Sequence, residues 1–240
     1  MSVISIGNFD GVHLGHQKIL GETVKLARIK NVKSFAFSIM YPYNYYKNNF
    51  EGLIYSIDIR IEKILNCGIE RIITADLSEI GDMEPEDFIK LLLKKGASGV
   101  VVGEDFRFGK RGSGDKDTLE NLSKKYNFDL KIVNDVKEKN CRVSSSIIKK
   151  YIQMGDINEI NSLLGSPYIL YGKVIKSSEK TILQRSFEKL VNLKNGDYLF
   201  EYNKEEVKVK VVNGEYLIQD KNKFESSEKK IELKAIKKII

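Results

Sequence analysis

The feature that most restricts the fold of this chain is an alternation of short apolar runs with amphipathic segments over its first two thirds. The apolar runs predict strands, because they are nearly all hydrophobic and are bounded by polar or glycine-rich residues. The segments between them carry apolar residues three and four apart, as Leu20, Val24 and Ala27 do, which predicts helices with one buried face. The predicted strands are 3–6, 34–40, 71–77, 99–106 and 128–136, and the predicted helices are 16–30, 56–68, 84–96, 117–126, 144–154 and 156–164.

Strands of this kind, separated by helices, predict an α/β fold: a Rossmann-like parallel sheet with helices on both faces. Such sheets bind their ligands beyond the carboxyl ends of the strands, where the chain turns into a helix. Three glycine-rich or polar segments are therefore expected to meet at that edge. They are 7–16, 103–115 and the residues leading into 143–150.

The pattern changes after Pro167, where hydrophobic and polar residues alternate with a period of two. The strongest local signal is Asn213-Gly214, a pair typical of a two-residue hairpin. We expect residues 1–167 to form the α/β domain and residues 168–240 a small antiparallel, barrel-like β domain. The alternating runs are 196–203, 205–212, 214–220 and 229–236.

The net charge of +7 is concentrated in the β domain, with 16 Lys or Arg against 11 Asp or Glu from Ile169 onward. These lysines alternate with apolar residues, which favours a solvated strand face over a nucleic-acid surface. No run approaches the length of a membrane span, and the first strand begins so early that no signal peptide is expected; we expect a cytoplasmic protein. The two cysteines, Cys67 and Cys141, lie far apart and are expected to be buried thiols.

Both histidines of the chain, His13 and His16, lie in the segment GNFDGVHLGH that follows the first strand. A glycine-rich turn into a helix lets backbone N–H groups approach a phosphate, and the helix N-terminus adds partial positive charge. The glycine spacing fits neither the dinucleotide fingerprint nor the P-loop. Two imidazoles at this position predict stabilisation of charge on a phosphoryl group during transfer. Ordinary helix-opening histidines are the alternative.

The segment resembles the His-x-Gly-His motif of nucleotidylyltransferases, and in particular the adenylyltransferase domain of prokaryotic FAD synthetases. VVGEDFRFGKRGSGD (101–115) and VSSSIIKK (143–150) resemble that family's later signatures, in the same order. The resemblance implies transfer of AMP from ATP, with Mg²⁺, to FMN, giving FAD and pyrophosphate. It assigns catalysis to His13, His16, Ser145 and Lys149, and nucleotide binding to Gly7, Asn8, Phe9, Asp10, Gly15, Gly103, Asp105, Phe106, Arg107 and Ser144.

Two of these assignments have structural alternatives. Asp105 and Arg107 would also suit a salt bridge with each other after the fourth strand, and the serines 144–146 would also suit a helix N-cap.

Three departures from the family pattern limit what the resemblance implies. Lys149 replaces the family's arginine, keeping the charge and losing the bidentate fork. On the acceptor side, the family's Pro-His-Pro becomes Tyr41-Pro42-Tyr43, and its Phe-Asp becomes Asp76-Leu77. The chain has only three prolines and none after Pro167, so the riboflavin kinase motif Pro-Thr-Ala-Asn is absent.

The β domain is therefore predicted to lack kinase activity and to serve in packing, in a homodimer or in covering the flavin. A different phosphorylated acceptor and a noncatalytic flavin or nucleotide binder are the competing hypotheses. Aromatic residues at 41–46 are candidates for stacking on a flavin ring, and they would equally suit shielding of the sheet edge.

Overall fold

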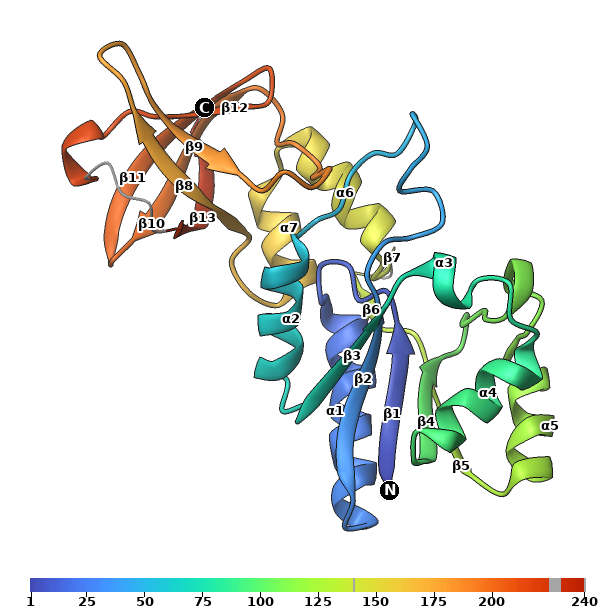
Figure 1. The fold of residues 1–240 in the computed structure, drawn as a ribbon. Coiled ribbons are helices and arrows are strands. Elements are labelled where there is room, and N and C mark those ends of the chain that lie inside the picture. Colours follow the sequence, from blue (N-terminus) through green and yellow to red (C-terminus); the bar gives the residue numbers. More distant parts are fainter. Residues whose placement is uncertain (140, 225–229, 240) are drawn as a thin grey trace. The chain divides into compact units, whose positions relative to one another are not determined.

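The computed structural model describes residues 1–139, 141–224 and 230–239, and these form two compact units. The first unit comprises residues 1–50 and 60–142, and the second comprises residues 51–59 and 143–240. Each unit has its own sheet (Figure 1). Among the described residues, no helix is both long enough and apolar enough to span a bilayer.

The first unit is built on a five-stranded parallel sheet in the order β3-β2-β1-β4-β5. This confirms the predicted Rossmann-like α/β class, because the strand order reverses direction at β1, the usual position of a ligand site. Its elements are β1 (Ser2–Gly7), α1 (Leu14–Ile29), β2 (Lys33–Ile39), α2 (Ile57–Asn66), β3 (Arg71–Ala75), α3 (Leu77–Ile80), α4 (Pro85–Lys94), β4 (Ala97–Gly103), α5 (Lys116–Tyr126) and β5 (Asp129–Val133), with α2 beginning in the second unit.

Helices cover both faces of this sheet (Figure 1). On one face Phe88 and Leu92 of α4 pack with Leu119 of α5 against Ile4 and Val100. On the opposite face α1 and α2 supply smaller clusters, which include Leu20 and Ile64 packed with Ala36. The two buried faces explain why the strands are nearly all apolar.

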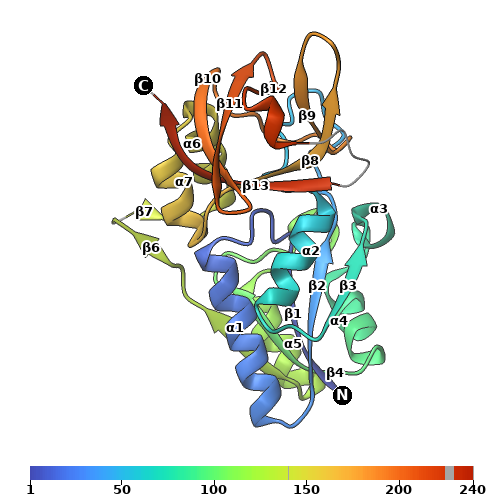
Figure 2. The same ribbon diagram turned by 90° about the vertical axis from the view of Figure 1, so that its left-hand side faces the viewer.

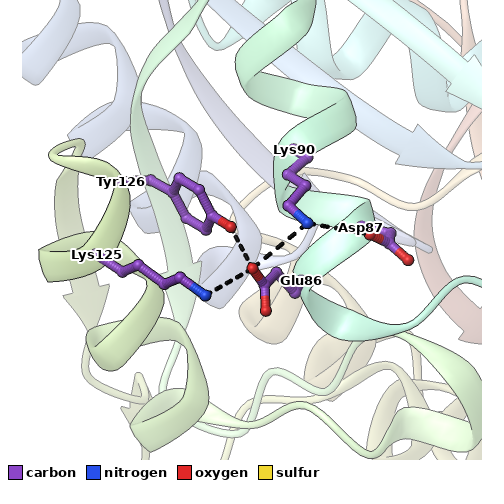
Figure 3. Close-up of polar contacts among 5 residues, drawn as sticks. All are labelled: Glu86, Asp87, Lys90, Lys125 and Tyr126. Atoms are coloured by element: carbon purple, nitrogen blue, oxygen red, sulfur yellow. Dashed lines mark hydrogen bonds and ion pairs between the residues drawn. The ribbon is translucent and has the colours of Figure 1, made fainter.

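A polar cluster joins the surfaces of α4 and α5 (Figure 3). The Glu86 carboxylate accepts hydrogen bonds from Lys125 Nζ, at 2.8 Å, and from the Tyr126 hydroxyl, and lies 3.4 Å from Lys90 Nζ. Lys90 also pairs with Asp87 at 3.5 Å. The hydrogen bonds from Lys125 and Tyr126 lower the pKa of Glu86 to about 2. The cluster therefore ties the two helices together at neutral pH.

The third, fourth and fifth strands end earlier than predicted, the fifth at Val133 and not at residue 136. The third strand ends at Ala75 and not at Leu77, because Asp76 accepts from the backbone N–H of Ser78 and forms a capping box with Glu79 at the start of α3. The fourth strand ends at Gly103, where a backbone turn from Gly103 O to Phe106 N begins. An apolar residue follows each turn, Leu77 after Asp76 and Phe106 after Asp105, so the apolar pattern alone places the strand ends too late.

The second unit contains a closed six-stranded barrel in the order β10-β11-β12-β9-β8-β13 (Figure 2). The antiparallel barrel confirms the predicted class of the C-terminal region. Asn213 and Gly214 join β11 to β12 with φ values of 49° and 82°, as a two-residue hairpin of this type requires. The elements are α6 (Ser145–Met154), α7 (Ile157–Leu164), β8 (Ile169–Lys176), β9 (Thr181–Arg185), β10 (Gly196–Tyr202), β11 (Glu205–Val212), β12 (Glu215–Ile218) and β13 (Lys230–Ile239).

Residues 51–59 belong to the second unit, although they lie far from it in the sequence. Leu53 exchanges backbone hydrogen bonds with the strand-like segment at Leu190, from Leu53 N to Lys189 O at 2.7 Å and from Val191 N to Leu53 O at 2.9 Å. Tyr55 is buried and stacks on Tyr168, with ring centroids 5.6 Å apart. The second unit is therefore completed by a segment from the first half of the chain.

The small hairpin of β6 (Lys137–Glu138) and β7 (Cys141–Arg142) corrects one expectation (Figure 2). Cys141 is exposed there and not buried, because a two-residue strand at the surface has no core to pack against. Cys67 is partly buried, and burial raises the pKa of its thiol. Short 3-10 helices at Lys110–Gly112 and Lys221–Lys223 complete the described elements.

Candidate active site

The histidines lie in a tight turn between β1 and α1, which we call the histidine turn (residues 7–16). Phe9 and Val12 adopt left-handed backbone conformations, with φ of 53° and 43°, and Val12 N donates to Phe9 O at 3.0 Å. The Phe9 ring is buried in the cluster beneath α1 and fixes the turn to the core. Gly7 leaves room for that ring, since a Cβ at Gly7 would lie 3.3 Å from it.

The two imidazoles stack on one another, with ring centroids 3.7 Å apart and an interplanar angle of 18°. His13 is the N-cap of α1, and its Nδ1 accepts a hydrogen bond from the backbone N–H of His16 at 3.4 Å. A neutral His13 that accepts at Nδ1 carries its proton on Nε2. The edge of the Phe9 ring meets His16 at a centroid distance of 5.4 Å. The turn thus fixes both the position of His13 and its tautomer.

Both imidazoles are held in the neutral form. The pKa of His13 is lowered to about 4, chiefly by burial and then by the charge of Arg142, while Asp105 opposes the shift. Burial also holds the pKa of His16 well below its ordinary value, assisted by His13 and Arg60. His13 is only 5% exposed. The charges of Arg142 and Asp105 shift the pKa of His13, and the charge of Arg60 shifts that of His16. The two buried rings therefore lie near charged side chains.

Arg60 of α2 is a residue of this site that the sequence analysis did not identify. Its guanidinium is buried and donates to Asn8 O at 2.8 Å and to Asn8 Oδ1 at 2.7 Å, within the histidine turn. The sequence signal that could have identified it is the position of Arg60 between Ile59 and Ile61 in a predicted amphipathic helix. Asp10, which follows in the turn, is also buried, at 3% exposed.

Asp105 and Arg107 both follow β4. Each pairs with another residue, so the alternative of a salt bridge between the two is wrong for the part of the chain that the structure describes. The Asp105 carboxylate accepts from Arg142 Nη2, and Arg142 Nε lies 2.5 Å from Asp135. Arg107 pairs with Asp115 at 3.4 Å, and the Asp115 side chain caps α5. Arg142 was not predicted as a site residue, although it lies two residues before Ser144.

Gly103 and Phe106 are the other two predicted nucleotide-binding residues at the end of β4. Gly103 is the last residue of β4, and β4 pairs with β1, so the segment leaves the sheet beside the histidine turn. Phe106 stacks on Phe108 at 5.5 Å and packs against the core that α4 and α5 cover.

Ser144, Ser145 and Lys149 belong to the second unit, at the start of α6. Ser144 is the N-cap of α6, and its hydroxyl accepts from Ile147 N at 3.4 Å. The structural alternative for the serines 144–146, a helix N-cap, is thereby confirmed for Ser144. Ser145 and Lys149 lie one helical turn apart on α6.

An aromatic cluster follows β2, in a segment that we call the aromatic loop (residues 41–50). Tyr45 contacts Tyr41, Tyr46 and Phe50, with centroid distances between 4.2 and 5.2 Å. Gly7 at the end of β1 is opposite Ser38 of β2, so the aromatic loop leaves the sheet beside the histidine turn. Tyr43 and Tyr46 are 80% and 70% exposed. Large exposed rings at a sheet edge are typical of a binding surface.

The site therefore combines a Rossmann-like parallel sheet with a first crossover helix that opens on two histidines. The sequence model of FAD synthetases matches residues 1–147. The chain belongs to the FAD synthetase family.

Several relatives match over most of this chain. A bifunctional riboflavin kinase/FMN adenylyltransferase of Buchnera aphidicola subsp. Schizaphis graminum is 32% identical over 184 residues, covering 74% of this chain and 59% of that protein. A protein of the same description from Bacillus subtilis is 31% identical, over 75% of this chain and 58% of its own length. An FAD synthetase of Listeria monocytogenes is 29% identical, over 75% and 74%. The chain thus spans about three fifths of the first two relatives.

The fold has a counterpart among solved structures. The crystal structure of a macrolide-efflux protein from Streptococcus pneumoniae matches with a TM-score of 0.83, covering 99% of this chain and 86% of that chain. The identity is 21%, so the likeness concerns the fold alone.

Proposed function

We propose that this protein is an FMN adenylyltransferase that transfers AMP from ATP to FMN, giving FAD and pyrophosphate. The observation that carries the proposal is the pair of neutral, stacked imidazoles at the opening of α1, directly after the central strand β1. A helix N-terminus that follows a parallel strand binds anions. His16 Nδ1 is buried and has no hydrogen-bond partner among the described residues, which supports a site that a ligand completes.

The transfer proceeds in line and needs no covalent enzyme intermediate. A phosphate oxygen of FMN forms a bond to the α-phosphorus of ATP, and the bond from that phosphorus to the bridging oxygen breaks as pyrophosphate leaves. The protein contributes position and charge stabilisation. In this mechanism His13 donates its Nε2–H to an oxygen of the α-phosphate, where negative charge builds up.

The other predicted residues complete this proposal. The phosphate turn is formed and braced by Gly7, Asn8, Phe9, Asp10 and Gly15. The nucleotide is held by Gly103, Asp105, Phe106 and Arg107. Ser144, Ser145 and Lys149 of α6 neutralise the pyrophosphate. Mg²⁺ arrives on the ATP phosphates, as is usual for this ion.

The two parts of the chain have different proposed functions. Residues 1–167 form the adenylyltransferase domain, and residues 168–240 form a reduced riboflavin kinase-like barrel without kinase activity. The lack of any proline after Pro167 supports this, since the kinase motif contains proline. The barrel serves in packing, in covering the flavin or in forming a homodimer. The protein acts in the cytoplasm.

The test is chromatography of FAD and a coupled assay of pyrophosphate, with ATP and either FMN or riboflavin as acceptor. We expect FAD from FMN and no product from riboflavin. Product from riboflavin would contradict the absence of kinase activity. Pyrophosphate release with another phosphorylated acceptor, and none with FMN, would identify a different adenylyltransferase. Nucleotide binding without turnover would contradict an enzymatic function.

A further inference from the structure

The Arg60 guanidinium joins two neighbouring strand ends at the edge of the sheet where the site lies. Nη1 donates to both oxygens of Asn8 and to Ile39 O, the last at 3.0 Å. Nη2 donates to Met40 O at 2.8 Å. Asn8 follows β1 and opens the histidine turn, and Met40 follows β2 and precedes the aromatic loop. One side chain therefore holds both segments.

The geometry of these bonds requires an arginine. A guanidinium offers five N–H donors in a rigid plane, whereas a lysine ammonium is a compact charge on a flexible stem. The acceptors lie at the ends of two different strands. Arg60 is 1% exposed, so water does not replace lost donors without a rearrangement. Lysine at this position would keep the charge and lose the simultaneous contacts.

The histidine turn needs such a support. Its residues Phe9 and Val12 have positive φ, a conformation that costs free energy and persists only where surrounding contacts fix it. Asn8 is the residue immediately before Phe9, and both of its oxygens are bound by Arg60. A shift of about 1 Å in a catalytic group can cost roughly 100-fold in rate.

We propose that Arg60 is a positioning residue that sets the histidine turn against the start of the aromatic loop, aligning the nucleotide donor with the acceptor. The inference rests on the proposed adenylyl transfer and deepens it, because it names the residue that couples the two substrate sites. Arg60 acts through Asn8 and Met40, and the step itself remains the transfer described above.

The experiment compares Arg60→Met, Arg60→Lys and a matched control, Ile64→Val, on the full chain. Ile64 is buried on the same helix and belongs to the core beneath α1, so its truncation perturbs packing without removing a polar contact. The readouts are kcat, KM for ATP and for FMN, and the temperature midpoint of unfolding. Arg60→Lys serves where Arg60→Met does not fold.

We expect Arg60→Met to lower kcat roughly 100-fold, and Arg60→Lys to lower it at least about tenfold, while Ile64→Val stays within about threefold of the wild type. A merely structural arginine would change the unfolding midpoint and leave kcat of the folded fraction unchanged. An Arg60→Lys enzyme with wild-type kcat and KM values would overturn the proposal.

The pH profile provides a second readout. The charge of Arg60 is one of the causes, after burial and His13, that lower the pKa of His16. Arg60→Met should therefore shift the acid limb of the profile to higher pH, and Arg60→Lys should not. An unchanged acid limb in Arg60→Met would contradict a close coupling of Arg60 to the histidines.

Failure of the proposed function has a different signature. If the wild-type protein forms no FAD, the affinity for ATP measured by calorimetry still tests whether Arg60 positions the histidine turn. Weaker ATP binding by Arg60→Met than by Ile64→Val would then support its action on the histidine turn, and equal binding would overturn it.

Discussion

The His13 and His16 rings stack at 3.7 Å, and the backbone N–H of His16 donates to Nδ1 of His13. Two imidazolium ions could not share this geometry without strong repulsion, and burial favours the neutral form of each ring. The pair is therefore suited to donate neutral N–H groups to a phosphoryl group, while the helix N-terminus contributes the positive field.

Removing either imidazole should impair turnover far more than folding. We expect His13→Ala and His16→Ala to lower kcat about 100 to 1000-fold, the usual cost of losing a donor to a transition-state oxygen. Because His16 packs on the Phe9 ring, His16→Gln is included as a variant that fills more of the space. FAD formation and circular dichroism are measured together. Near wild-type FAD formation by His16→Ala would remove the histidines from the mechanism.

The buried histidines should make stability depend on pH in mildly acidic solution. The folded pKa of His13 is about 4 and its ordinary value is 6.5, so the unfolded state binds the proton first as pH falls. The stabilisation is complete above pH 6.5 and is lost as pH decreases toward 4. Urea unfolding from about pH 7 to about pH 4.5 should show this decrease. A His13→Gln variant should show a shallower slope; equal slopes would contradict the assignment.

The aromatic loop should affect the acceptor and not the donor. Stacking of an aromatic ring on a base is worth about 1–3 kcal/mol. If Tyr43 and Tyr46 stack on the flavin, the double change to serine should raise KM for FMN about tenfold, with little change in KM for ATP. Phe187→Ser is the matched control, because Phe187 is 99% exposed on the second unit. A parallel rise in both KM values would argue against flavin stacking.

Residues 51–59 should be needed for the stability of the second unit. Tyr55 is buried against Tyr168, and its hydroxyl accepts from Ile169 N at 3.3 Å. Tyr55→Ala should cost about 3–5 kcal/mol of unfolding free energy, as large-to-small changes of aromatic core residues do. Tyr55→Phe should cost about 1 kcal/mol for the lost hydrogen bond. The exposed Tyr43→Ala serves as the control in chemical denaturation, and an equal effect of Tyr43→Ala and Tyr55→Ala would contradict this account.

Local sequence signals predicted those elements whose formation depends on local properties. The parallel strands were found because both of their faces are apolar, and the Asn213-Gly214 hairpin because few other residues tolerate positive φ at both positions. β8 and β9 were not identified among the predicted strands. β9 is only five residues long, and its pairing with distant β12 is not encoded in its own pattern.

The histidine turn was located from sequence because a glycine-rich strand-to-helix turn binds anions through its own backbone, so neighbouring residues suffice to indicate it. The burial of its two rings, their depressed pKa values and the hydrogen bonds of Arg60 depend on contacts between segments that are far apart in the sequence. The inclusion of residues 51–59 in the second unit is of the same kind. Sequence by itself determined which groups the chain offers; only the tertiary structure decided which of them lose water and meet, because desolvation and long-range hydrogen bonds are properties of the packed fold.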